Sequence, residues 1–295
     1  MGEIVIQMKG VTKTFHSEKK VVNDLTLDIH RGETISFLGP NGAGKTTTIS
    51  MILGLISHDT GHISVLGKKP GTKEVRTKVG VMLQDISMID NLKVREVIDL
   101  FRSYYPNPNP LDYLLKVSDL EADQNAMANK LSGGKIRRLQ FALAMAGDPE
   151  ILFLDEPTVG MDINAKKIFW AEIRKYLKKG KTIILTSHDL SELDSISDRV
   201  VIINKGSIIA DSTVNELKNL YSTNRIQFKY NNQLNIAEIK KWDYIQNVQL
   251  NEEIILIETS NVNATLSNLL KQGIDISEIE VSRGSLEDVL LNLTQ

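Results

Sequence analysis

The stretch Gly39-Pro40-Asn41-Gly42-Ala43-Gly44-Lys45-Thr46 decides the fold of this chain. It follows the pattern G-x-x-x-x-G-K-T, which is typical of a loop that binds phosphate groups. The apolar run 34–38 before it predicts a buried strand, and residues 47–55 after it predict a helix. Glycines let successive N–H groups converge, and a helix start adds partial positive charge. The sequence therefore predicts a phosphate-binding loop between a strand and a helix.

Four side chains in and after this loop carry the expected chemistry. Lys45 supplies a full charge to the outer phosphates, and the Thr46 hydroxyl can bind Mg²⁺. Asp155 and Glu156 end the apolar run 151–154, which predicts a buried strand. One carboxylate there can hold Mg²⁺, while the next takes a proton from an attacking water molecule.

Composition excludes several other classes of protein. The 295 residues are 41% hydrophobic and 24% charged, which is typical of a globular protein. A net charge of −2 gives no electrostatic case for binding nucleic acid. The absence of cysteine excludes disulfides, thiolate zinc sites and a cysteine nucleophile. The N-terminus has no signal-peptide pattern, and no apolar run approaches the roughly 18 residues that cross a bilayer.

The pattern along the chain predicts an α/β fold in two domains. Residues 3–38 alternate apolar and polar positions, which indicates antiparallel strands with one solvated face. Buried strands and helices then alternate, so the main sheet should be mostly parallel. Residues 1–220 should form the main domain, with a helical subdomain at about 85–140. Residues 221–295 should form a small α+β domain.

The run Leu131-Ser132-Gly133-Gly134-Lys135 is the most specific feature. With it the chain resembles the ATP-binding subunits of ABC transporters, whose signature LSGGQ lies between the Walker A loop and the Walker B strand. The resemblance covers about residues 1–220. It implies a P-loop NTPase with a RecA-like parallel core, an antiparallel β subdomain and a helical subdomain. The nucleotide-binding residues that it implies are Phe15, Gly39, Asn41, Gly42, Gly44, Lys45, Thr46, Thr47, Ser132, Gly133, Gly134 and Asp162.

The same resemblance implies a role for each polar residue. Phe15 stacks on adenine, and Asp162 lies in a D-loop that pairs across a dimer. Ser132 and the Gly133 and Gly134 amides face the γ-phosphate of ATP held by a second protomer, so two chains close over two ATP molecules. The implied catalytic residues are Glu156, His188, Gln84 and Lys45. The implied Mg²⁺ ligands are Thr46, Gln84 and Asp155.

Two positions depart from the family pattern, and the tail narrows the group. Lys135 replaces the usual glutamine, and Val159 replaces a more usual serine or alanine in the D-loop. The residues that meet phosphate are intact, so we expect activity to survive. Residues 284–294 resemble the closing motif of the bacitracin, multidrug and sodium-export group. They also read as a capped amphipathic helix.

The sequence thus predicts an ATPase that drives a separate membrane permease. We expect a homodimer or heterodimer with a second ATP-binding subunit at the cytoplasmic face of the membrane, with residues near 85–105 docking the permease. The group that the tail resembles favours export of drugs, peptides, lipids or ions. The alternatives are a soluble ATPase that acts on nucleic acid or ribosomes, and a regulatory or immunity module. Too few residues separate the loop from the signature for a long coiled coil, and Glu156 and His188 argue against an inactive module.

Overall fold

The computed structural model describes residues 2–15, 19–83, 89–187, 189–221, 223–229, 235–251, 253–272, 278–282 and 284–294. The chain divides into two compact units, Met1–Ser212 and Thr213–Gln295. The boundary expected from the sequence lies between residues 220 and 221. Helix α8 (Val214–Tyr221) accounts for the difference, because it packs against α11 (Leu286–Thr294) near the end of the chain.

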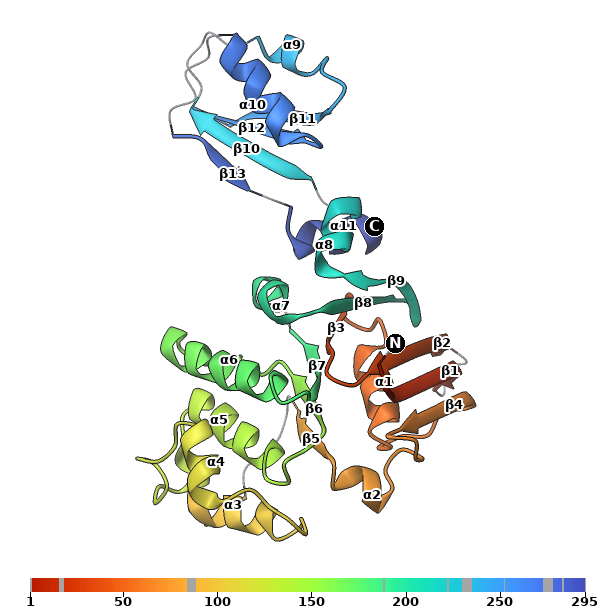
Figure 1. Ribbon diagram of the computed structural model, residues 1–295, viewed down its shortest axis with the longest axis vertical. Helices are drawn as coiled ribbons and strands as arrows, with labels where there is room; N and C mark the ends of the chain where they lie inside the picture. Colours follow the sequence, from red (N-terminus) through yellow and green to blue (C-terminus); the bar gives the residue numbers. More distant parts are fainter. Residues whose placement is uncertain are drawn as a thin grey trace. The chain divides into compact units, whose positions relative to one another are not determined.

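Two sheets form the first unit (Figure 1). The antiparallel sheet has the order β2-β1-β4, and the larger sheet has the order β5-β6-β7-β3-β8-β9. The strands of the two sheets are β1 (Ile4–Thr14), β2 (Lys20–His30), β3 (Thr34–Leu38), β4 (Thr60–Val65), β5 (Val79–Met82), β6 (Ile151–Asp155), β7 (Thr182–Thr186), β8 (Arg199–Asn204) and β9 (Ser207–Thr213). Its helices are α1 (Lys45–Ile52), α2 (Lys73–Arg76), α3 (Val94–Arg102), α4 (Leu111–Val117), α5 (Gly133–Ala144), α6 (Ile163–Leu177) and α7 (Leu190–Ile196), with a short 3₁₀ turn at Ala128–Lys130.

The larger sheet is parallel from β5 to β8. Strand β3 lies between β7 and β8, and β6 lies on the other side of β7. Parallel neighbours end at one edge of a sheet, and ligands of open α/β sheets bind beyond that edge. The ends of β3, β6 and β7 therefore share one edge, which carries the phosphate loop and both acids of the sequence analysis.

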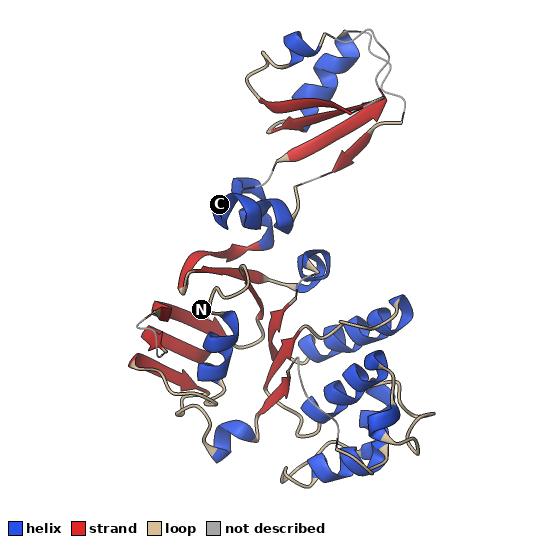
Figure 2. Ribbon diagram, turned by 180° about the vertical axis from the view of Figure 1, so that it is seen from behind, coloured by secondary structure: helices blue, strands red, loops and turns tan. Residues whose placement is uncertain are grey.

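Helix α1 lies in the core of the first unit, where it holds the phosphate loop in place. Its buried Ile49 and Ile52 belong to one apolar cluster with Ile6 of β1 and with Phe153 and Val201 of the parallel sheet. Burying an aliphatic side chain of this size contributes about 1.5–3 kcal/mol. Helix α1 is thus packed against both sheets, and this packing also fixes the position of the loop at its start. Figure 2 shows α1 as a helix beside the antiparallel strands.

Helices α3, α4 and α5 pack together, in the part of the chain where the sequence predicts a helical subdomain (Figure 1). A short ladder joins the start of α3 to the chain before the signature. Leu92 O accepts from the Ala128 N–H (2.9 Å), and the Val94 N–H donates to Ala126 O (3.0 Å). The Arg95 N–H donates to Gln124 O (3.1 Å). These bonds give the first N–H groups of α3 partners that the helix itself cannot supply.

The second unit contains a β-α-β-β-α-β sequence. Its strands are β10 (Asn224–Lys229), β11 (Ile245–Asn251), β12 (Ile254–Thr259) and β13 (Glu280–Ser282), with helices α9 (Ile236–Ile239) and α10 (Val262–Lys271) between them. The sheet order β11-β12-β10-β13 is antiparallel, which is the split βαβ arrangement of ferredoxin-like domains. Ile239 of α9 and Leu269 of α10 pack on Phe228 and Ile257, so both helices cover one face.

Charged side chains join the sheet of the second unit to its final helix. Arg225 contacts Glu258 (3.3 Å) and Asp288 (2.7 Å). Asp288 also accepts the Ser285 N–H (2.9 Å), while Ser285 Oγ accepts the Asp288 N–H (3.2 Å). This reciprocal capping box begins α11, as the tail sequence predicts for a capped helix.

Among the helices that the structure describes, none combines the length and the apolar character needed to cross a bilayer.

Candidate functional site

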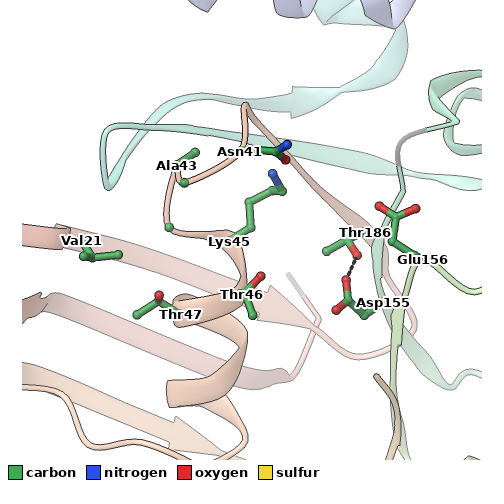
Figure 3. Close-up of a pocket in the computed structure, with 11 residues that line it drawn as sticks. Val21, Asn41, Ala43, Lys45, Thr46, Thr47, Asp155, Glu156 and Thr186 are labelled. Atoms are coloured by element: carbon green, nitrogen blue, oxygen red, sulfur yellow. Dashed lines mark hydrogen bonds between the residues drawn. The ribbon is translucent and has the colours of Figure 1, made fainter. Parts of the chain in front are cut away.

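A cavity of about 170 Å³ opens at the shared strand edge (Figure 3). It brings together most of the loop residues and both acids, although the sequence separates them by more than a hundred positions. Val21, Ala43 and Thr186 also line it, and none of the three is among the site residues that the sequence predicts. The predicted residues that line it are Asn41, Gly42, Gly44, Lys45, Thr46, Thr47, Asp155 and Glu156.

The loop backbone fits its surroundings so closely that it requires glycine. At Gly39 the backbone has φ +145°, and a Cβ there would lie 2.0 Å from the carbonyl oxygen of Ile203 on β8. The first bond of α1 runs from the Thr48 N–H to Gly44 O (2.9 Å). The N–H groups of Lys45, Thr46 and Thr47 precede that bond, so the helix supplies no acceptor for them. They make a helix start that suits an anion.

Lys45 is half-buried against the loop that precedes it. Its Nζ donates to Gly39 O (2.6 Å) and Pro40 O (3.2 Å). Burial lowers the pKa of the Lys45 ammonium, while the nearby carboxylates of Glu156 and Asp155 raise it. Backbone carbonyls are weak partners for a charge, so an anion that enters the cavity offers this ammonium a stronger one.

The two acids after β6 have different surroundings. Asp155 accepts a hydrogen bond from the Thr186 hydroxyl at the end of the neighbouring β7 (Figure 3). Glu156 is only 5% exposed, and its N–H donates to Thr186 O (3.1 Å). Its backbone lies in the left-handed region (φ +50°), which is unfavourable for a residue with a side chain. Strain of this kind persists where the surrounding structure fixes it, often at functional sites.

The signature residues lie at the start of α5, outside the cavity. Ser132 is the N-cap residue, and both Ser132 and Gly133 are exposed. Gly134 packs against the D-loop, because a Cβ there would lie 2.7 Å from the carbonyl oxygen of Gly160. Asp162 caps α6, since its Oδ1 accepts the Ala165 N–H (2.8 Å). This geometry is that of an N-cap residue, and the pairing of Asp162 across a dimer stays a prediction.

Phe15, Gln84 and His188 are three further residues that the sequence predicts for the site. Phe15 lies just beyond β1 and is 45% exposed, with Lys13 Nζ 5.5 Å from its ring centroid. It does not line the cavity. Gln84 and His188 lie outside the described residues.

Comparison with known proteins places this geometry in a family. The family model described as "ABC transporter" matches residues 22–159. A Nod factor export ATP-binding protein I from Rhizobium sp. (strain N33) is 34% identical over 304 residues, which cover 100% of this chain and 98% of that protein. The chain belongs to the ATP-binding subunits of ABC transporters. It is therefore an ATPase subunit of a membrane-associated transporter, as the sequence predicts.

Further relatives agree with this assignment. The protein of the same name from Bradyrhizobium diazoefficiens is 38% identical over 218 residues, which cover 72% of this chain and 71% of that protein. A solved ATP-binding subunit of an ABC transporter matches with a TM-score of 0.68 and 25% identity, over 74% of this chain and 93% of that one. A dimeric ATP-binding cassette in a post-hydrolysis state, bound to ADP and Pi, matches with a TM-score of 0.65 and 26% identity over 71% and 98%. The P-loop fold of the first unit is thereby confirmed.

The donors around the cavity fit a magnesium ion that arrives with a nucleotide. The Thr46 hydroxyl and the Asp155 carboxylate both line it, and Mg²⁺ prefers such oxygen ligands. Within the described residues, no cluster of three or more His, Cys, Asp or Glu side chains could hold a metal by itself. The oxygens of Thr46 and Asp155 suit Mg²⁺, which usually takes one or two protein ligands and completes its shell with water and phosphate oxygens.

Proposed function

We propose that this chain is one of two ATP-binding subunits that close over two ATP molecules and drive export through a separate permease. One observation carries the proposal. A single cavity combines an open helix start, the Lys45 ammonium and two carboxylates. The first two bind phosphate, and the carboxylates supply a metal ligand and a base.

The residues of the cavity divide this work between them. The amides at the start of α1 and Lys45 bind the β- and γ-phosphates. Thr46 and Asp155 hold Mg²⁺, which neutralises phosphate charge when it is bound. Glu156 orients the attacking water and accepts its proton. Gln84 and His188 complete the metal shell and the γ-phosphate contacts in our proposal, by resemblance to the family.

The exposed start of α5 supports a shared site. Ser132 and Gly133 lie outside the cavity that holds the loop of the same chain, yet they form a second helix start that suits an anion. A second protomer would bring its own Ser132 to this chain's nucleotide, and Asp162 would lie near the contact. The solved relative bound to ADP and Pi is dimeric.

The transport direction and the location rest on the relatives. Proteins that match most or all of this chain are named for Nod factor export. We therefore propose export, with the subunit held at the cytoplasmic face of the membrane by a permease that docks near residues 85–105. The resemblance of residues 284–294 to the closing motif of an export group also favours export. The net charge of −2 does not favour the alternative of a nucleic-acid or ribosome ATPase.

The Glu156→Gln variant tests the proposal. We expect it to bind ATP, to lose nearly all hydrolysis and to accumulate as a closed dimer, because the amide keeps its shape but accepts no proton. Phosphate release and sedimentation in the presence of ATP measure the two effects. Glu172→Gln on α6 is the matched control, since Glu172 pairs only with a surface lysine of its own helix among the contacts described (2.6 Å to Lys175). Full hydrolysis by Glu156→Gln would refute the role of Glu156.

A further inference from the structure

The start of α5 is unusually rich in positive charge. Lys135, Arg137 and Arg138 lie in its first two turns, and its first turn holds no acidic residue. Cations are unfavourable near the positive end of a helix. Each of these side chains must therefore find a partner from another segment, and each does so.

Two of the three contacts fix the helix to its surroundings. The buried Arg137 donates from Nη1 to Leu83 O (2.9 Å), just before the segment that contains Gln84. Arg138 donates from Nη1 to Asp119 O (2.9 Å) and also pairs with the Asp119 carboxylate. Neither contact involves the residue that departs from the family pattern.

Lys135 is that residue, and it forms an ion pair. Its Nζ lies 2.7 Å from Asp123 Oδ1, with the two side chains 38% and 22% exposed. Asp123 belongs to a closely bonded segment, because its N–H donates to Leu120 O (3.0 Å) and its carbonyl accepts the Ala126 N–H (2.8 Å). The carboxylate that pairs with Lys135 therefore stands on a backbone segment that is itself hydrogen-bonded.

The same segment holds the start of α3. Ala126 O and Gln124 O accept the N–H groups of Val94 and Arg95. A continuous chain of contacts thus runs from α3, through residues 124–126, to Asp123 and Lys135, and ends at the exposed Ser132. The glutamine usual at this position carries no charge and cannot form this ion pair.

We propose that Lys135 is a positioning residue, whose ion pair with Asp123 makes the signature and the start of α3 move as one body. The inference rests on the proposed function, in which Ser132 and Gly133 complete the ATP site of a second protomer. In that dimer the Lys135 of each protomer would hold the signature of the same protomer in position to contact the partner's nucleotide. Through the pair, a displacement of α3 would also displace the signature residues at the shared ATP site.

A different role for Lys135 makes an opposite prediction. If its ammonium bound the phosphates of the partner's nucleotide, Asp123 would compete for it. Removing the Asp123 charge would then strengthen the dimer. In the role that we propose, removing either charge weakens the dimer to the same extent.

The test measures dimer dissociation constants by sedimentation, with ATP and magnesium, in a Glu156→Gln parent. A partly exposed ion pair changes an equilibrium by up to about 5-fold, and a symmetric dimer contains two, so we expect up to about 25-fold weakening. Lys135→Gln and Asp123→Asn should show the same loss. The exchanged double variant Lys135→Asp with Asp123→Lys should recover most of it. Lys175→Gln, which breaks a pair of similar length on α6, should leave the constant unchanged.

Each other result is decisive. A tighter dimer in Asp123→Asn would overturn the proposal in favour of direct phosphate contact. Equal losses in both single variants without recovery in the exchanged variant would also overturn it, because the ion pair itself would then be irrelevant. A Glu156→Gln parent that stays monomeric with ATP would refute the proposed dimer, and this inference with it.

Discussion

Gly133 and Gly134 adjoin in the sequence, but the structure predicts opposite effects for alanine at the two positions. A Cβ at Gly133 meets nothing within 4 Å, whereas one at Gly134 lies 2.7 Å from the Gly160 carbonyl oxygen. Alanine in a helix is favoured over glycine by up to about 1 kcal/mol, so Gly133→Ala should stabilise the first unit slightly. At Gly134 that gain is opposed by overpacking, which costs about 1–3 kcal/mol.

The two tryptophans allow a clean measurement. Trp170 is buried in α6 of the first unit and Trp242 lies in the second. In a Trp242→Phe background, tryptophan fluorescence during urea unfolding reports the first unit alone. We expect Gly134→Ala to unfold at lower urea than Gly133→Ala, with a difference of about 1–3 kcal/mol. Equal midpoints for the two variants would refute the packing argument.

Gly133→Ala should have opposite effects on stability and on ATP-dependent dimerisation. In our proposal the Gly133 amide faces the partner's nucleotide, and the open space that admits a methyl group is the space the phosphate needs. Gly133→Ala should therefore weaken ATP-dependent dimerisation although it stabilises the fold. An alanine at this position that leaves dimerisation and ATPase rates unchanged would contradict the shared site.

Two further predictions follow from single contacts. Thr186→Val removes the hydroxyl that donates to Asp155, and loss of such a supporting bond should lower the ATPase rate about 10- to 100-fold while ATP still binds; an unchanged rate would show that Asp155 needs no such support. Burial raises the pKa of Asp288, but hydrogen bonds from Ser285 and the charge of Arg225 outweigh it, so the net pKa is lowered. The stability that Asp288 contributes should be complete above about pH 4, the ordinary range of an aspartate, and lost as pH falls through the lower folded value. Unfolding of Asp288→Asn in a Trp170→Phe background, followed by the fluorescence of Trp242, should differ from its parent at pH 7, and the difference should shrink as the pH falls below about 4; a constant difference would refute this account.

The sequence predicted those parts of the site that local pattern determines. A strand, a glycine loop and a helix are adjacent in the chain, so residues 34–52 were foreseeable. Asp155 directly follows the continuous apolar run 151–154, and such a run is typical of a buried parallel strand. The signature helix was foreseeable from Ser132, a residue that favours the N-cap position.

Contacts that depend on sheet order and on side chains of distant segments could not be predicted. The bond between Thr186 and Asp155 needs β6 beside β7 in one register. The place of Val21 in the cavity depends on how the antiparallel sheet packs on α1. The Lys135–Asp123 pair joins residues of two different segments, and no sequence pattern predicts that these two residues meet.

The central position of β3 has a consequence for the order in which the protein can mature. Thr34 pairs with Ile183 of β7, and Leu38 pairs with Ile202 of β8, so the strand before the phosphate loop has no neighbour until far more of the chain exists. Contacts this distant in sequence form late and slowly. A nascent or cleaved chain that ends between the signature and β7 therefore carries the whole loop but should not retain ATP. Limited proteolysis within residues 103–110, between α3 and α4, would leave both partners of β3 attached by packing, and nucleotide binding should survive it.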